Sequence, residues 1–315
     1  MNKIIVFQTD FGLDDAAISA MEGVSYSVSQ DLNIRHLTHN IPQYNIFDAS
    51  YRLHQAITYW PEGTVFVSVV DPGVGSNRKS VVAKTVTNQY VVTPDNGTLT
   101  HIDRFIGIEE IREIEERTNR LKNSELSYTF HGRDVYAYTA ARLASETISF
   151  EQVGPLMDKE DIVKLELYGC KKIPNGVMGQ IDILDVRFGS LWTSIPYSDF
   201  KACGFDFGDD ILVEIYHDDV KVYSNKINYG KSFADVEINE PLIYMNSAYD
   251  MAVAINQGSF SKVYGIGVGK EWKITMTKKD EQKRGTAADL DLFPLPLRHR
   301  FSLCLFSLPQ LQCCP

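Results

Sequence analysis

Acidic residues and glycines follow apolar, β-branched runs at three places in the first hundred residues. The stretch "VVDPGVGSNRK" ends such a run with Asp71 and, after a glycine-rich turn, places Arg78 seven residues later. Similar turns occur in "QTDFGLDD" and "VVTPDNG". In open α/β sheets, ligands bind outside the carboxyl ends of the strands, so carboxylates that follow several strands can meet at one edge. The acids that we expect at this edge are Asp10, Asp14, Asp15, Asp71 and Asp95.

Each of these acids also has an ordinary structural explanation. Asp and Asn are favoured in turns and at the N-caps of helices. Asp14 or Asp15 could cap the helix that we expect after them, and "PDNG" is a common turn sequence. Their recurrence at equivalent strand ends is what favours a functional site.

A histidine in "YTFHGRDVYAY" completes a candidate proton-transfer site. His131 precedes an expected helix, and Gly132 leaves room beside it; the ordinary alternative is a packed or capping ring. An imidazole takes up a proton near neutral pH, a carboxylate can orient it, and a guanidinium can hold an anion. We therefore group His131 with Asp71 and Arg78. No GxSxG nucleophile motif occurs in the sequence, which favours water as the nucleophile.

The composition limits the kinds of partner. The chain has 315 residues, a formal net charge of −10 and a pI near 5.2. We expect no nucleic-acid partner, because no basic face is available for phosphates; a cationic or zwitterionic small molecule fits better. No run approaches the ~18 apolar residues of a membrane span, and the N-terminus does not resemble a signal peptide. Five cysteines without CxxC spacing, together with these absences, predict a cytoplasmic protein with no metal and no cofactor.

Strands and helices alternate in the first half of the chain, which predicts an α/β domain over residues 1–167. Its mainly parallel sheet would carry helices on both faces, because the strand run at 64–71 is apolar throughout. The expected strands lie at 3–8, 33–39 and 64–71, the expected helices at 14–30, 45–60 and 132–146, and an expected hairpin at 80–94.

Short β runs replace this alternation after residues 168–176. They predict a smaller all-β, barrel-like domain over residues 174–279, with a helix at 247–259 set against it. The segment 280–315 has no clean period, several prolines and clustered cysteines. We expect it to be an extension outside the fold, artificial in origin or disordered; a genuine docking segment is the alternative.

Four motifs, in the order "TDFGxDD", "VVDPGVGxxR", "TPDNGxLT" and "TFHGRDV", resemble those of the S-adenosyl-L-methionine (SAM) hydroxide adenosyltransferases. These SAM hydrolases are related to fluorinating and chlorinating enzymes. The resemblance continues through "DVRFGSLWTSI" and "YMNSAYDMAVAINQGS" and covers roughly residues 3–278. It implies hydrolysis of SAM to adenosine and L-methionine. It also implies a homotrimer that holds the ligand between the first domain of one subunit and the second domain of its neighbour.

The resemblance assigns the catalytic role to Asp71, Arg78 and His131. Water or hydroxide would attack the ribose C5′ in line and expel neutral methionine, so the leaving group needs no general acid. Our hypothesis is that His131 and Asp71 draw the proton from water, whereas Arg78 steadies the nascent hydroxide. Making and aligning this nucleophile in a dry pocket are the two tasks of the site.

The same resemblance implies the substrate contacts. Asp10 would take the ribose hydroxyls, Asp14 and Asp185 the methionine ammonium, and Asn256 with Gln257 the adenine. The other implied contacts are Tyr44, Phe130, Ser190, Trp192, Asn246 and Ser247. Among these, the aromatic residues would wall the ligand, since an aromatic face suits a cation. Ordinary core packing is the alternative for Phe130 and Trp192.

Some positions depart from those of the halogenating relatives. Those enzymes carry Tyr where this chain has Asp71 and Ser where it has Gly132, and they contain an insertion that "AKTVTNQYVV" lacks. All three differences favour water over halide. Relatives often have Asn at position 190, and the halogenating enzymes have Arg where this chain has Ala248. The resemblance therefore leaves open how the methionine carboxylate is held.

Two other functions are alternatives. "TDFGLDD" also resembles the "DTDxGxDD" calcium motif of nucleoside N-ribohydrolases, although Gln8 replaces its first acid. Activity abolished by EDTA would support that function. A non-catalytic SAM- or nucleoside-binding protein is the second alternative; it would not need Asp71, Arg78 and His131 together.

Overall fold

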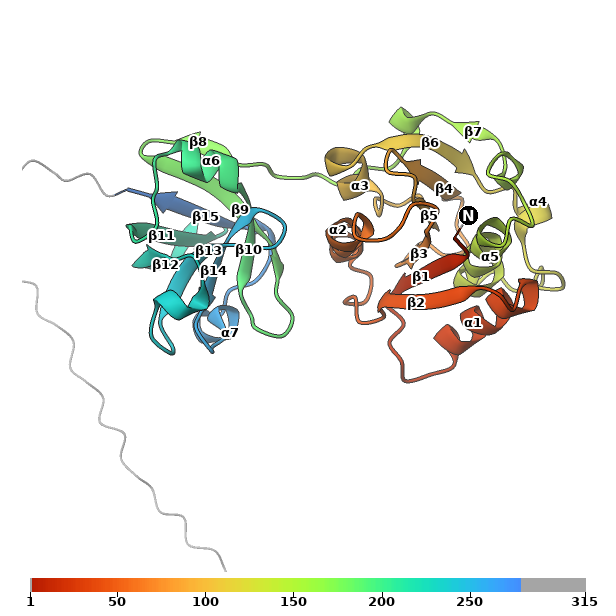
Figure 1. Cartoon of the computed structure of the whole chain (residues 1–315), viewed down its shortest axis with the longest axis horizontal. Coiled ribbons are helices and arrows are strands. Elements are labelled where there is room, and N and C mark those ends of the chain that lie inside the picture. Colours follow the sequence, from red (N-terminus) through yellow and green to blue (C-terminus); the bar gives the residue numbers. More distant parts are fainter. Residues whose placement is uncertain (1, 279–315) are drawn as a thin grey trace, which may run out of the picture. The chain divides into compact units, whose positions relative to one another are not determined.

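The computed structural model describes residues 2–278, and its strands form two separate sheets (Figure 1). The first sheet uses strands between Ile4 and Met157, and the second uses strands between Lys171 and Thr277. The expected extension at 280–315 lies outside the described residues. The fold class is confirmed: a mixed α/β part is followed by a β-barrel.

The first sheet has seven strands in the order β2-β1-β3-β5-β4-β6-β7. Its four strands β2, β1, β3 and β5 are parallel, whereas β4, β6 and β7 pair in antiparallel fashion. The expected hairpin is present as β4 and β5. The bounds are β1 Ile4–Thr9, β2 Asn33–Thr38, β3 Val65–Val69, β4 Ser80–Thr85, β5 Tyr90–Pro94, β6 Ile108–Glu113 and β7 Leu156–Met157.

Helices cover both faces of this sheet, as the apolar strand at 64–71 predicts. Helix α1 and the segment ending in α5 pack on the face that carries Ile5 and Phe7 of β1. Helices α2 and α3 pack on the opposite face, with Val6 and Phe66. The helical bounds are α1 Ala17–Val28, α2 Ile46–Ile57, α3 Thr100–Phe105, α4 Glu116–Asn119, a π-helical segment Gly132–Ala137, and α5 Tyr138–Ala144; 3-10 turns cover Glu151–Val153 and Lys159–Asp161.

The chain order creates a topological switch between β1 and β3. From β1 the chain crosses through α1 to β2 on one side, and then through α2 to β3 on the other side. At such a point the loops that follow the two strands diverge and leave a crevice where ligands bind. Asp10 directly follows β1, and Asp71 lies two residues after β3. The fold therefore places these two acids on either side of one crevice.

The second sheet closes into a barrel. Its order is β10-β14-β13-β12-β11-β15-β9-β8, and a further pairing of β10 with β9 closes a ring of seven strands, with β8 outside it. Alternate side chains such as Ile181, Val213, Ile227 and Ile274 fill the interior. The bounds are β8 Lys171–Ile173, β9 Gly176–Leu184, β10 Leu191–Pro196, β11 Asp210–His217, β12 Val220–Tyr229, β13 Pro241–Met245, β14 Asp250–Ile255 and β15 Gly269–Thr277; α6 Tyr197–Ala202, α7 Phe260–Tyr264 and a 3-10 turn Phe233–Asp235 complete the domain.

The prediction of a helix at 247–259 is wrong. Strand β14 occupies 250–255 and pairs with β10 and β13, and only the short helix α7 follows it. Met251, Val253 and Ile255 face the barrel interior, whereas Ala252 packs with Trp192 on the outer face. A strand that is buried on both faces has no polar alternation, so its sequence can be mistaken for a buried helix.

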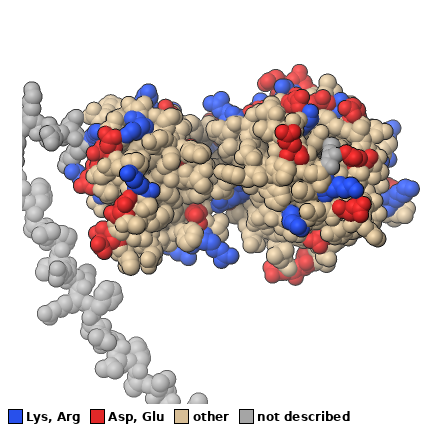
Figure 2. All heavy atoms as spheres, viewed as in Figure 1, with Lys and Arg blue, Asp and Glu red and all other residues tan. Residues whose placement is uncertain are grey.

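Charged residues of both signs are interspersed on the face shown in Figure 2. Lys and Arg lie among Asp and Glu on this face, without a continuous basic area. Among residues 2–278, no helix is both long and apolar enough to span a membrane.

Candidate active site

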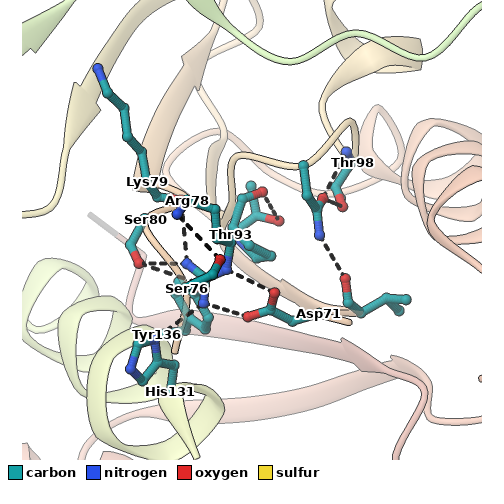
Figure 3. Close-up of polar contacts among 12 residues, drawn as sticks. Asp71, Ser76, Arg78, Lys79, Ser80, Thr93, Thr98, His131 and Tyr136 are labelled. Atoms are coloured by element: carbon teal, nitrogen blue, oxygen red, sulfur yellow. Dashed lines mark hydrogen bonds and ion pairs between the residues drawn. The ribbon is translucent and has the colours of Figure 1, made fainter. Parts of the chain in front are cut away.

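Asp71 and Arg78 form an ion pair across the glycine turn that follows β3 (Figure 3). Arg78 Nε lies 2.7 Å from Asp71 Oδ1, and its Nη2 lies 2.5 Å from Oδ2. Gly75 adopts φ +78° in this turn, and a Cβ there would lie 3.1 Å from the Tyr128 carbonyl oxygen. The side chains of Arg78 and Asp71 are only 10% and 4% exposed. The turn thus returns the guanidinium to the carboxylate in a bidentate, largely buried pair.

His131 joins this pair through Arg78. Its Nδ1 lies 3.1 Å from Arg78 Nη2. A guanidinium can only donate hydrogen bonds, so Nδ1 accepts, and the neutral imidazole carries its hydrogen on Nε2. That Nε2 is buried and has no hydrogen-bond partner among the described residues. The convergence of the three residues, which the sequence predicted, is therefore present in the fold, with Arg78 between the other two.

The surroundings favour the neutral form of His131. Burial lowers the pKa of its imidazole, and the charges of Arg78 and Arg120 lower it further, whereas Glu116 and Asp71 act in the opposite direction. Burial opposes the charge of Arg78, but the hydrogen bonds that it donates to Asp71 and the charges of Tyr136, Asp71 and Glu116 together raise the pKa of Arg78. The site at neutral pH therefore combines a charged guanidinium with an uncharged imidazole.

Further contacts fix the orientation of Arg78. Its Nη1 donates to Ser80 Oγ at 3.1 Å, and Ser80 Oγ lies 3.2 Å from the hydroxyl of Tyr136 (Figure 3). The guanidinium lies over the Tyr136 ring, 5.6 Å from its centroid. Tyr136 is fully buried, and this burial raises the pKa of its hydroxyl. The cation is thus held by partners on three sides before any ligand binds.

The Asp71 carboxylate also borders a cavity of about 790 Å³ at the switch between β1 and β3. Asp10 lines the same cavity, and its Oδ2 accepts a hydrogen bond from the Tyr44 N–H at 2.9 Å. Tyr44 adopts a left-handed conformation, with φ +66°. The lining residues are Asp10, Phe11, Asp15, Ala16, Ala17, Ala20, Gln43, Tyr44, Asp71, Thr129, Phe130 and Arg133.

Several of these lining residues were absent from the sequence-based prediction. Phe11 lies within the "TDFGLDD" motif, and Thr129 and Arg133 flank His131 in "TFHGRDV", so the motifs already contained the signal. The Phe11 ring meets the Phe130 ring edge to face, with centroids 6.0 Å apart. Gln43 precedes Tyr44 in a loop without a motif, and no sequence signal pointed to it.

Not every expected acid reaches the cavity. Asp14 is exposed and is not among its lining residues. Asp15 lines it, and its Oδ1 also accepts a hydrogen bond from Ala17 N at the start of α1, although the N-cap position itself is Ala16. Asp95 is buried elsewhere, where its Oδ1 accepts from Val163 N at 2.9 Å. Asp95 directly follows β5, which is parallel to β3, so it lies at the expected edge, but its carboxylate has a structural role and does not line the cavity.

The residues expected from the second domain lie in other places. Asp185 Oδ1 accepts from the N–H groups of Arg187 and Phe188, and Asp185 borders a separate cavity of about 670 Å³. Asn256 and Gln257 line a third cavity, of about 640 Å³. All residues that line the 790 Å³ cavity belong to the first domain. Among residues 2–278, none of the contacts expected from the second domain lines this cavity.

The remaining expected contacts from the second domain lie at β10 and in the turn before β14. Trp192 is 8% exposed and packs with Tyr51, Ile183 and Ala252, which matches the core-packing alternative. Ser190, two residues before Trp192, is also buried. Asn246 Oδ1 accepts from the N–H groups of Ala248 and Asp250 and shapes the turn before β14; Ser247 is exposed in that turn.

Comparison with known families agrees with this geometry. The family model for the SAM hydroxide adenosyltransferase N-terminal domain matches residues 5–154, and the model for the C-terminal domain of the same family matches residues 179–273. The chain belongs to the SAM hydroxide adenosyltransferase family. The catalytic candidates lie in the N-terminal family domain, whereas Asp185, Asn256 and Gln257 lie in the C-terminal one.

Relatives of this family member match along nearly their whole length. It is 31% identical to an (R)-S-adenosyl-L-methionine hydrolase from Methanocaldococcus jannaschii, over 86% of this chain and 95% of that protein. It is 24% identical to a fluorinase from Actinopolyspora mzabensis, over 86% and 97%. A crystal structure of an uncharacterized conserved protein from Thermotoga maritima is similar, with a TM-score of 0.79, 34% identity, and coverage of 87% and 100%.

The family assignment does not support the calcium-dependent ribohydrolase alternative. The resemblance to that enzyme class rested on "TDFGLDD" alone, whereas the adenosyltransferase models match both domains in order. Within residues 2–278, no group of three or more His, Cys, Asp or Glu side chains is arranged to hold a metal ion.

Proposed function

We propose that this protein hydrolyses SAM to adenosine and L-methionine by attack of water on the ribose C5′. Three (R)-S-adenosyl-L-methionine hydrolases are 29–31% identical to it over 84–86% of the chain. The observation that carries the proposal is the Asp71–Arg78–His131 group beside the cavity at the β1/β3 switch.

The reaction needs one proton acceptor and no acid. The water oxygen forms a bond to C5′, the C5′–S bond breaks with its electron pair going to sulfur, and the attacking water loses one proton. Each oxygen of the Asp71 carboxylate accepts one hydrogen bond from Arg78 and keeps a second lone pair. Because Asp71 borders the cavity, we assign it the role of receiving that proton.

His131 receives a different role from the one in our sequence-based hypothesis. Its Nδ1 already accepts from Arg78, so this nitrogen cannot take a proton from water without losing the guanidinium. We assign His131 to holding Arg78, which in turn orients Asp71 and places a positive charge where hydroxide character develops. Arg78 keeps the role of steadying the nucleophile.

The cavity suits a cationic substrate with a ribose. The Asp10 carboxylate can accept hydrogen bonds from two ribose hydroxyls. Phe11 and Phe130 line the cavity with aromatic rings, and such rings can face a sulfonium cation. A Cβ at Gly132 would lie 3.2 Å from Phe11 and 3.3 Å from Phe130, so a serine there would displace these rings. This crowding supports water rather than halide as the nucleophile.

A neighbouring subunit would complete the site. The 790 Å³ cavity is lined by the first domain alone, and the apolar side chains of Leu13 and Tyr44 near it are 70% and 68% exposed. In the second domain, Val186 and Phe188 next to Asp185 are 76% and 67% exposed. We propose a homotrimer in which these surfaces meet and close the cavity over SAM. Sedimentation or light scattering of the purified protein tests the subunit number.

Incubation with SAM tests the function directly. Chromatography should show adenosine and methionine in equal amounts, and reaction in ¹⁸O-water should label the 5′-oxygen of adenosine. Asp71→Asn is the control, since it keeps the side-chain shape and removes the charge. Binding of SAM without turnover would support a non-catalytic sensor, and unlabelled adenosine would exclude water as the nucleophile.

A further inference from the structure

The Arg78 guanidinium has a second set of contacts on the side away from Asp71. Its Nη1 donates to Ser80 Oγ at 3.1 Å, and Ser80 Oγ lies 3.5 Å from Oε1 of Glu116 (Figure 3 shows Ser80 and Arg78). Glu116 begins helix α4 and belongs to none of the motifs that the sequence analysis singled out. A chain of polar groups therefore runs from Asp71 through Arg78 and Ser80 to a second carboxylate.

Glu116 also borders a separate recess behind the site. This cavity of about 290 Å³ is lined by Arg78, Ser80 and Glu116, together with residues around Glu113, and none of its lining residues borders the 790 Å³ cavity. The Glu116 side chain is 36% exposed. Arg78 thus lies between a ligand-sized cavity that Asp71 borders and a smaller recess that Glu116 borders.

Glu116 is itself held in place. Its Oε2 accepts from Arg120 Nη1 at 2.7 Å, and the Arg120 side chain is 6% exposed. Arg120 lies over the Tyr128 ring, 4.6 Å from its centroid, and its Nη2 donates to the Ser127 carbonyl. The Glu116–Arg120 pair therefore ties α4 to the segment that leads into His131.

The charged groups that face His131 come from the loop after β3 and from α4 with the residue that follows it. Asp71 and Arg78 come from the loop after β3, Glu116 from α4, and Arg120 from the residue after α4; the rings of Tyr128 and Tyr136 complete its surroundings. Two guanidinium groups thus face an imidazole whose Nε2 is buried and unpartnered among the described residues. Glu116 is the carboxylate whose charge most favours the protonated form of His131, ahead of Asp71.

We propose that Glu116 is a positioning residue for the hydrolysis, which holds Ser80 against Arg78 and balances the two guanidinium groups that face His131. The inference rests on the proposed function, because the reaction gives Arg78 its role. Glu116 does not line the 790 Å³ cavity that Asp71 borders and does not contact the reacting atoms, so it acts through Arg78. Removing its charge should misplace the guanidinium and leave substrate binding nearly intact.

Glu116→Gln tests the proposal, with Glu113→Gln as a matched control. Glu113 borders the same recess, but its carboxylate pairs with Lys79 at 3.3 Å rather than with Ser80. Glu116→Gln should lower kcat about tenfold and change KM less than about twofold, the pattern of a lost transition-state contact. Glu113→Gln should match the wild type in both constants.

A measurement without substrate separates this inference from the proposed function. The imidazole nitrogens of His131 are titrated by NMR in each variant. Because the charge of Glu116 raises the pKa of His131, Glu116→Gln should move the titration of His131 to lower pH than in the wild type. Glu116→Asp keeps the charge, so His131 in this variant should titrate close to its wild-type pH. If His131 responds to Glu116→Gln as expected but the wild-type protein does not hydrolyse SAM, the proposed function is refuted and the charge coupling between Glu116 and His131 is not.

Equal kcat and equal His131 titration in Glu116→Gln and Glu113→Gln would overturn the proposal. Thermal unfolding checks each variant, since Glu116 also pairs with Arg120. If Glu116→Gln does not fold, Ser80→Ala decides, because it breaks the link to Arg78 and leaves the Glu116–Arg120 pair intact. It should lower kcat with little change in KM, and an unchanged kcat would refute the positioning role.

Discussion

Arg78 Nη2 lies 3.1 Å from His131 Nδ1, so the guanidinium donates to the imidazole as well as to Asp71. A protonated His131 would turn an N–H toward the N–H of Arg78, and the contact would be lost. The active arrangement therefore requires a neutral imidazole. This requirement links the pH dependence, the role of Arg78 and the choice of proton acceptor.

Activity should fall on the acid side of neutrality. Burial lowers the pKa of His131 from its ordinary value of 6.5, so the neutral ring persists somewhat below that pH and is lost as the pH falls further. The profile of kcat/KM against pH should show an acid limb below pH 6.5 with a slope of one proton. A profile that is flat down to pH 4.5 would show that protonation of His131 does not matter.

Arg78→Lys should lower kcat about a hundredfold or more, as for the loss of a preorganised electrostatic group. Lysine keeps the charge but has one nitrogen, which cannot serve Asp71, Ser80 and His131 at once. The KM for SAM should change little, because Arg78 does not line the substrate cavity. Steady-state kinetics measures both constants, and retention of most of kcat would show that charge alone suffices.

Asp71→Asn should lower kcat by at least two orders of magnitude, because the amide cannot receive the proton. Adenosine should still bind with nearly wild-type affinity, since Asp10 rather than Asp71 is assigned to the ribose. Calorimetric titration of adenosine supplies the second readout. Loss of binding together with turnover would mean that Asp71 holds the substrate instead.

Mixing two inactive variants tests the shared site. In a trimer with sites between subunits, Asp71→Asn damages the first-domain half, and Asp185→Asn damages the second-domain half while keeping an oxygen for Arg187 N. The two variants are unfolded, mixed in equal amounts and refolded together, so that their subunits combine at random. About one quarter of the sites should then have the wild-type residue at both positions. If each subunit carries a complete site, the mixture will show only the average of the two variants.

Asp250 should make the protein less stable as the pH rises through neutrality. Burial raises the pKa of its carboxyl to about 7, above its ordinary value of 3.8. The folded state therefore holds a proton that the unfolded state releases between these values, so its contribution to the free energy of unfolding is complete below 3.8 and lost as the pH passes 7.

Asp250→Asn should remove this dependence. We expect it to raise the free energy of unfolding at pH 8.5 by roughly 1 kcal/mol or more, since no buried charge must form. Urea unfolding at pH 5 and pH 8.5 measures the difference, and Asp210→Asn, at an exposed position on β11, is the control. Equal effects of the two substitutions would show that the Asp250 carboxyl does not titrate in this range.

The sequence predicted the architecture where patterns are local. Strands such as Val65–Val69 and the turn between Asp71 and Arg78 follow from short-range signals, and strand-end logic correctly joined Asp10 to Asp71. It also placed Asp95 at this edge of the sheet, after β5, but it did not show that Val163 N holds the Asp95 carboxylate outside the cavity. The sequence-based prediction failed at β14, where both faces are covered and no alternation remains.

Other parts of the candidate site depend on side-chain geometry that a sequence does not contain. The hydrogen-bond role of His131 Nδ1 follows from the position of the Arg78 guanidinium, which depends on the fold of two separate loops. Glu116 lies in no recognised motif, and it reaches the site through Ser80 and through its charge near His131. Contacts of this kind join residues that are distant in the chain, and their spacing carries no periodic signal.

The switch between β1 and β3 has a consequence for changing the chemistry of this protein. Asp10, Asp71 and His131 sit in connecting segments, whereas the strands beneath them are held by packed apolar layers on both faces. A designer could rewrite the residues that choose the nucleophile, such as Asp71 and Gly132, without disturbing the scaffold. Reprogramming toward other small nucleophiles should therefore be limited by the fit of a few loop side chains and not by the tolerance of the folded framework.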